Sequence, residues 1–176
     1  LGAEPTALKK SLALVDENLA IQPASENARR ARAMVLALST DRKARREAVD
    51  ILEKLVGSQK SLTAEGMPES RFVLAQLYAD ASDFSKAAGH LRRLIASEGD
   101  NPRYLAYYVQ FLVNRNEIDE AALWVPNLLK LAPQDFSTWN LVTAVKFWQK
   151  HYDELCTTID QVIDNPTVSE GERGRV

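Results

Sequence analysis

The chain has 176 residues, of which 45% are hydrophobic and 26% charged, and its net charge is −2. This composition excludes an intrinsically disordered chain and offers no overall positive field for nucleic acid or an anionic membrane. The single cysteine, Cys156, excludes an internal disulfide framework, and no apolar run approaches the ~20 residues of a membrane-spanning helix. A soluble protein is expected, with its compartment open and the cytoplasm slightly preferred.

The first part of the chain predicts three helices. Apolar residues recur at helical spacing throughout and no segment shows the alternation of a strand, so the expected fold class is all-α. Residues 6–23 predict an orphan helix without a partner, and residues 28–56 predict an atypical helix pair. Residues 57–68 carry glycine and proline signals that predict a longer connection.

Three further helix pairs follow, and the second helices repeat every 34 residues. The aligned second helices begin at Phe84, Ile118 and Tyr152, and each has its expected inward-facing positions at i, i+3, i+7 and i+10. Asn101 and Pro102 predict a helix start, with asparagine as the cap and proline in the first turn. Such a period predicts stacked units, none of which can bury its apolar face alone. The expected pairs are 70–81 with 83–95, 103–114 with 117–129, and 137–149 with 151–163.

Pro126 falls in the middle of the predicted helix 117–129. A proline there removes one backbone hydrogen bond and crowds the carbonyl four residues back. Because Val125 and Leu128 occupy inward positions of the repeat, Pro126 is expected to point outward. It is interpreted as a tolerated kink that adjusts curvature, with a functional hinge as the alternative.

The positions within each pair also carry a family signature. In the first clear pair, the small, aromatic and apolar positions are Leu74, Ala75, Tyr78, Ala87, Leu91 and Leu94, with Gly99 where a proline is expected. In the second pair they are Tyr108, Val109, Leu112, Ala121, Val125 and Leu128, closed by Pro133. The third pair has Trp139, Val142 and Thr143, but Lys146 replaces an aromatic residue and Leu155 a small one.

This pattern resembles the tetratricopeptide repeat (TPR), most clearly over residues 68–166. The resemblance implies an α-solenoid of antiparallel helix pairs with a right-handed superhelix, arranged as a single array over residues 1–176. Its clear repeats are expected at 68–100, 102–134 and 136–166, with 167–176 as a tail or the start of a further helix. Both ends look cut, so the chain is interpreted as a segment of a longer solenoid.

The sequence holds no motif for catalysis or for binding a cofactor. It has no phosphate-binding glycine loop, and His90 and His151 lie far apart as expected surface or boundary residues. Cys156 has no cysteine partner and is expected to be a semi-buried structural thiol. We therefore expect no enzyme activity, no catalytic residue, no cofactor and no metal site.

Residues 28–46 form a basic stretch with a local balance of +6. Its cations are expected as two clusters near opposite ends of one helix, and a solvated surface is the default interpretation. Docking of an acidic partner is the sharper alternative, and RNA the weaker one, because the chain as a whole is mildly acidic. The charged residues are Arg29, Arg30, Arg32, Arg42, Lys43, Arg45 and Arg46, against Asp41 alone.

In the TPR family, first helices line a concave groove, and the resemblance implies that this groove binds a peptide or helix of a protein partner. The expected function is a non-catalytic interaction scaffold whose partner is not identified. The alternative is a structural spacer or self-association module of a larger multidomain protein, in which Phe147 and Trp148 would be covered by an adjoining repeat. Carrying over the frame, the expected groove residues are Phe72, Gln76, Asp80, Arg103, Tyr107, Gln110, Asn114, Asn140, Phe147 and Trp148.

Overall fold

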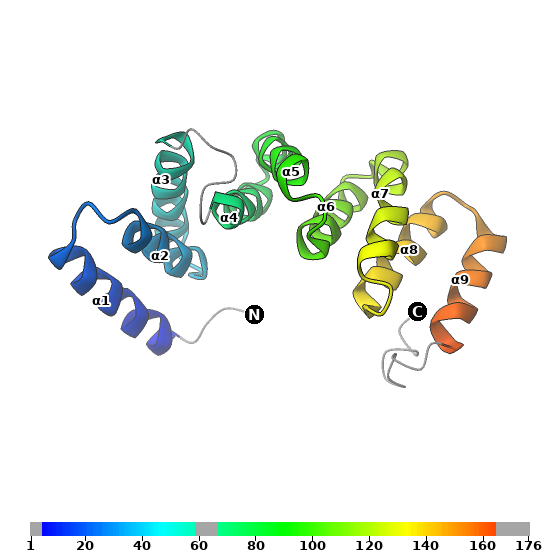
Figure 1. Cartoon of the computed structure of the whole chain (residues 1–176), viewed down its shortest axis with the longest axis horizontal. Coiled ribbons are helices and arrows are strands. Elements are labelled where there is room, and N and C mark those ends of the chain that lie inside the picture. Colours follow the sequence, from blue (N-terminus) through cyan, green and yellow to red (C-terminus); the bar gives the residue numbers. More distant parts are fainter. Residues whose placement is uncertain (1–4, 59–66, 165–176) are drawn as a thin grey trace. The chain divides into compact units, whose positions relative to one another are not determined.

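The computed structural model describes residues 5–58 and 67–164, and within these ranges all regular structure is helical (Figure 1). The chain divides into two compact units, Leu1–Ser97 and Glu98–Val176. The predicted all-α class is therefore confirmed over the described residues. The expected connection at 57–68 and the expected tail at 167–176 fall largely or wholly outside them.

The first unit contains five helices that pack in sequence order. Helix α2 packs against α1, α3 and α4, and α3 also packs against α4. The contact between α4 and α5 includes the Tyr78 and His90 rings, which stack with centroids 5.7 Å apart. Leucines such as Leu52, Leu74 and Leu91 are fully buried between the helices. The bounds are α1 Pro5–Ile21, α2 Glu26–Ala37, α3 Arg42–Ser58, α4 Met67–Asp80 and α5 Phe84–Glu98.

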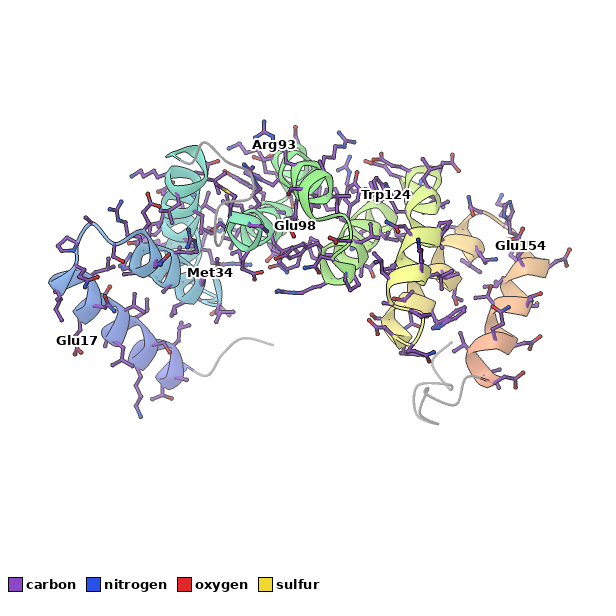
Figure 2. All side chains as sticks on the ribbon, viewed as in Figure 1. Glu17, Met34, Arg93, Glu98, Trp124 and Glu154 are labelled. Carbon is purple, nitrogen blue, oxygen red and sulfur yellow. The ribbon has the colours of Figure 1, made fainter. Side chains whose placement is uncertain are left out.

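The second unit contains two helix pairs. Helix α6 packs against α7 and α8, while α8 packs against α7 and α9. Trp124 of α7, labelled in Figure 2, meets the Tyr108 ring of α6 edge-on at 5.7 Å. Lys146, which stands where the repeat pattern expects an aromatic residue, is half-buried and donates to Glu154 of α9 at 2.9 Å. The bounds are α6 Pro102–Asn114, α7 Ile118–Leu131, α8 Phe136–Trp148 and α9 Tyr152–Asp164.

The turns inside the last three helix pairs have one geometry, spaced by 34 residues. Ser82, Asn116 and Lys150 have left-handed φ values of 62°, 59° and 62°. In each turn the next residue's N–H donates to a carbonyl five residues back, as in Asp83 to Tyr78, and the left-handed residue donates three residues back. These bonds satisfy carbonyls that the ending helix leaves free, which is the Schellman arrangement. The period predicted from apolar residues therefore recurs in the backbone.

The start signals and apolar frames of the sequence are mostly confirmed. Asn101 caps α6 by accepting the Arg103 N–H at 3.1 Å, with Pro102 as the first helical residue. Phe84, Ile118 and Tyr152 are each the first residue of a second helix. Their expected burial is wrong, however, since Phe84 is 39% and Tyr152 55% exposed. The first turn of a helix extends past the neighbour that covers the later positions of the same stripe.

Pro126 lies inside a continuous α7, as the repeat frame predicts. Its side chain is exposed, whereas Val125 and Leu128 are buried. The missing N–H leaves the carbonyl of Ala122 without its normal helical donor. Packing of the buried positions on both sides thus keeps the helix formed through the proline.

Candidate functional site

A stripe of polar and aromatic side chains runs along one face of α6. We call Arg103, Tyr107, Gln110 and Asn114 the α6 stripe; they follow one another at intervals of four, three and four residues, which places them on one helix face. Arg103, Gln110 and Asn114 are exposed and Tyr107 is half-buried. Gln110 Nε2 donates to Asn114 Oδ1 at 2.8 Å. All four residues belong to the predicted groove set.

The α6 stripe is held in place by the buried face of the same helix. Large apolar side chains on the rest of the helix are almost completely inaccessible to solvent, and they fix its rotation about its own axis. The Tyr108 hydroxyl adds a link to the second helix of the pair, donating to Glu120 at 2.7 Å. The buried residues of α6 are Tyr104, Leu105, Tyr108, Val109, Phe111 and Leu112.

The adjacent first helix, α8, contributes the other predicted groove residues of the second unit. Asn140 is exposed, and Phe147 and Trp148 are 51% and 56% exposed, with their rings edge-on at 5.7 Å. Trp148 lies 34 residues after Asn114 and so occupies the equivalent place on the next first helix. Exposed aromatic pairs of this kind are typical of surfaces that bind another molecule.

The predicted groove residues of the first unit have different environments. Gln76 is half-buried, and Asp80 is exposed and forms an ion pair with Arg45. Phe72 is only 2% exposed, so it cannot contact a partner as predicted. Helix α4 is buried on almost every side, and residues on a helix apolar all round are covered whichever way they point.

The basic stretch 28–46 is divided between two helices rather than lying along one, which corrects the sequence interpretation. Arg32 on α2 forms ion pairs with Asp16 of α1 and Glu47 of α3. The hydrogen bonds to Glu47 and then to Asp16 raise the pKa of Arg32. Arg30 Nε donates to Ser70 of α4 at 3.2 Å. These arginines thus link neighbouring helices, each exposed pair contributing about 0–1 kcal/mol.

A polar cluster joins three helices of the first unit. The Tyr78 hydroxyl of α4 donates to Glu53 of α3, and the Tyr78 ring stacks on His90 of α5. Burial, and then the charge of Arg71, lowers the pKa of His90. Burial also raises the pKa of Tyr78, so its hydroxyl keeps its proton. Partners 12 and 25 residues from Tyr78 in the sequence leave no local signal, so sequence reasoning missed this cluster.

Two expectations about reactive and metal-binding groups can be compared with the described residues. Cys156 is exposed and not semi-buried as expected. His90 lies at a helix boundary and His151 is exposed, as expected. Over residues 5–58 and 67–164, no group of three or more histidine, cysteine or acidic residues is arranged to hold a metal ion. No helix in the same ranges is long and apolar enough to cross a membrane.

Comparison with known proteins identifies the fold. No protein-family model and no curated protein matches the sequence. Among solved structures, YrrB, described as a TPR protein with an unusual peptide-binding site, superposes with a TM-score of 0.71 at 15% identity, over 97% of this chain and 83% of that one. The chain has a TPR-like repeat fold. The structure of MamA also superposes on this TPR-like chain, with a TM-score of 0.72 at 13% identity over 96% of this chain and 92% of that one.

At these identities the likeness establishes the fold and nothing about ligands. It confirms the resemblance drawn from the 34-residue period, including the helix pairs on which that resemblance depends. In a TPR-like repeat, α6 and α8 are the first helices of their pairs. The α6 stripe therefore lies on the kind of helix that the family resemblance assigns to partner contact.

Proposed function

We propose that this protein is a non-catalytic interaction scaffold that binds a peptide or helix of a protein partner through the first helices of its second unit. TPR-like folds generally serve as protein-interaction scaffolds, and YrrB is described as having a peptide-binding site. The observation that carries the proposal is the α6 stripe, continued on α8 by Asn140, Phe147 and Trp148.

The chemistry of the α6 stripe suits a peptide. The amides of Gln110 and Asn114 offer both donors and acceptors to an extended peptide backbone. Tyr107 supplies a large contact area at little entropic cost, and Arg103 can donate two parallel hydrogen bonds to a carboxylate. A few such side chains dominate the affinity of most interfaces. We therefore place the main binding energy on Arg103 and Tyr107.

The test compares two double variants that carry the same change in charge. Arg103→Glu/Tyr107→Ala alters the α6 stripe, whereas Lys130→Glu/Leu123→Ala alters exposed residues of α7. Each is immobilised and incubated with native lysate, and the captured proteins are quantified by mass spectrometry. We expect a defined set of proteins to be retained by wild type and by the α7 variant and lost by the α6 variant. Equal capture by all three proteins would refute the proposal, provided that circular dichroism shows each variant folded.

Self-association, as a spacer or assembly module of a larger protein, is the second candidate. It is favoured by the exposed rings of Phe147 and Trp148 and by Tyr152 at the start of α9. Sedimentation velocity of wild type and of Phe147→Ser/Trp148→Ser tests it. A dimer that the substitutions dissociate would support this candidate, and a wild-type monomer at high concentration would contradict it.

RNA binding through the stretch 28–46 receives less support. A nucleic-acid surface needs cations free to meet successive phosphates. Arg30, Arg32 and Arg45 instead contact neighbouring helices of the first unit. The arginines of this stretch that remain lie near the start of α3.

A further inference from the structure

A cleft of about 700 Å³ opens in the first unit, between the start of α3 and the end of α4. Its walls come from residues 40–49 and 77–82, so it includes the turn that precedes α3 and the turn that follows α4. We call it the α3–α4 cleft. Its volume lies within the range of about 300–1,000 Å³ that is usual for ligand sites. It is separate from the α6 stripe, since all its residues belong to the other unit.

The α3–α4 cleft is positively charged. Three arginines and one aspartate line it: Arg45 forms an ion pair with Asp80, whereas Arg42 and Arg46 are exposed. Among the described residues, no acidic side chain forms an ion pair with Arg42 or Arg46. The only acidic residue near them in sequence, Asp41, accepts the Lys43 N–H at 3.1 Å as the cap of α3. Two guanidinium groups on one wall are thus available to an anionic ligand.

The placement of Arg42 and Arg46 has no explanation in the stability of α3. Both lie in the first two turns, where the helix dipole disfavours a cation. Their neighbour Arg45 gains a contact to α4 from the same part of the helix, but Arg42 and Arg46 gain none from within the described residues. Cations held at an unfavourable helix end and lining a cleft are better explained by a ligand that contacts them.

The rest of the cleft is apolar and small. Val49 is half-buried and Leu77 is buried, and both line the cleft beside the arginines. Ala81 adds a third apolar side chain from the turn after α4. Such a surface fits a single aliphatic side chain next to the charged wall. The combination of guanidinium groups and an aliphatic pocket matches a peptide in which acidic and apolar residues are neighbours.

The same walls are poorly suited to nucleic acid. Single-stranded nucleic acids need aromatic faces on which bases stack and a continuous track of cations. The aromatic residue of the cleft, Tyr78, is buried, its ring stacks on His90, and Lys86 Nζ lies 4.8 Å from the ring centroid. The Asp80 carboxylate would also repel a neighbouring phosphate.

We propose that the α3–α4 cleft is a second docking site, which takes an acidic segment of a protein partner. Arg42 and Arg46 hold carboxylates of that segment, and Val49 and Leu77 accept an aliphatic side chain beside them. The charge complementarity of the wall fixes the class of ligand. The proposal does not depend on the α6 stripe.

The test uses a fluorescent, capped peptide in which glutamates alternate with leucines, and a matched peptide with glutamine in place of glutamate. The variant is Arg42→Gln/Arg46→Gln, and the control is Arg92→Gln/Arg93→Gln, which removes two exposed arginines from α5 (Figure 2 labels Arg93). Replacing first-turn cations with glutamine leaves the helix formed. Binding is followed by fluorescence anisotropy at low ionic strength.

We expect the glutamate peptide to bind wild type and the α5 control alike, and Arg42→Gln/Arg46→Gln about tenfold more weakly, from the loss of two exposed charge-assisted contacts. Backbone amide shifts in NMR spectra should concentrate in residues 40–49 and 77–82. Equal binding of the glutamine peptide, an equal loss in the α5 control, or no binding to wild type would each overturn the proposal. So would a uridine oligonucleotide that binds the cleft more tightly than the peptide.

Discussion

The left-handed turns allow the 34-residue repeat to be tested at single backbone positions. Lys150 has φ 62°, a conformation in which its Cβ crowds the backbone at a cost of roughly 1–2 kcal/mol. Glycine removes that cost but adds about 0.5–1 kcal/mol of entropy to the unfolded chain. Lys150→Gly should therefore raise the free energy of unfolding by about 0.5–1 kcal/mol. For a unit of this size, the midpoint temperature should rise by roughly 4 °C.

The control is the same substitution in ordinary helical backbone. Lys130 is exposed in the last turn of α7, where glycine is a weaker helix former, so Lys130→Gly should lower stability by about 0.7 kcal/mol. Asn116 has the same turn geometry as Lys150, but asparagine tolerates it, so Asn116→Gly should change stability by less than about 0.5 kcal/mol.

The assay is urea denaturation followed by tryptophan fluorescence. All three tryptophans, Trp124, Trp139 and Trp148, lie in the second unit, as do the three substituted positions. The fluorescence transition therefore reports the unit that is perturbed. If Lys150→Gly destabilises as much as Lys130→Gly does, the left-handed turn is not strained and the reasoning is wrong. A gain in Asn116→Gly equal to that in Lys150→Gly would also contradict it.

Three further predictions concern the core, the proline and one histidine. Leu128→Ala should lower the free energy of unfolding of the second unit by about 3 kcal/mol because Leu128 is fully buried, whereas Leu123→Ala on the exposed side of α7 should change it by less than about 0.5 kcal/mol; equal losses in urea titrations would show that α7 does not pack as described. Pro126→Ala should raise it by about 2 kcal/mol, since a new N–H reaches a free helical carbonyl, and an unchanged midpoint in the same titration would contradict this. Because the pKa of His90 is lowered from 6.5 in the folded state, the unfolded chain binds more protons just below pH 6.5; the first unit should lose stability as the pH falls through that window, a loss that His90→Phe should abolish and His151→Phe should leave, as measured by circular dichroism in urea.

The helices and their pairing could be predicted because their signals are local or periodic. The cap at Asn101 needs only the next two residues, and it is confirmed in the structure. The outward position of Pro126 follows from Val125 and Leu128, whose frame recurs in the other repeats. Repetition supplied three versions of the same pattern, which made the apolar stripe clear even where one version departs from it.

Individual exposures were less predictable because they depend on which neighbours cover a helix. Phe72 and Tyr107 were both assigned to the groove from the family frame, yet Phe72 is buried and Tyr107 half-buried. The frame gives the direction of a side chain but not the extent of the helix packed above it. Tyr152 shows the opposite error, since an inward direction did not bury a residue in the first turn of α9.

The left-handed turns and the α3–α4 cleft left weaker signals. Ser82, Asn116 and Lys150 are aligned by the period, but only asparagine is typical of that conformation, so their residue types hide the shared geometry. Arg45 and Arg46 are adjacent and chemically identical, but only Arg45 pairs with Asp80, which is 35 residues away. The difference between a structural arginine and an available one is thus set by tertiary contacts.

The two proposed surfaces can be separated because each is built within one unit. If they act independently, Arg103→Glu should leave binding of the acidic peptide unchanged, and Arg46→Gln should leave the proteins captured through the α6 stripe unchanged. The combined variant should then show the two losses without any interaction between them. If Arg46→Gln also releases the proteins that the α6 stripe captures, a single partner contacts both surfaces, and the independence of the two sites is refuted.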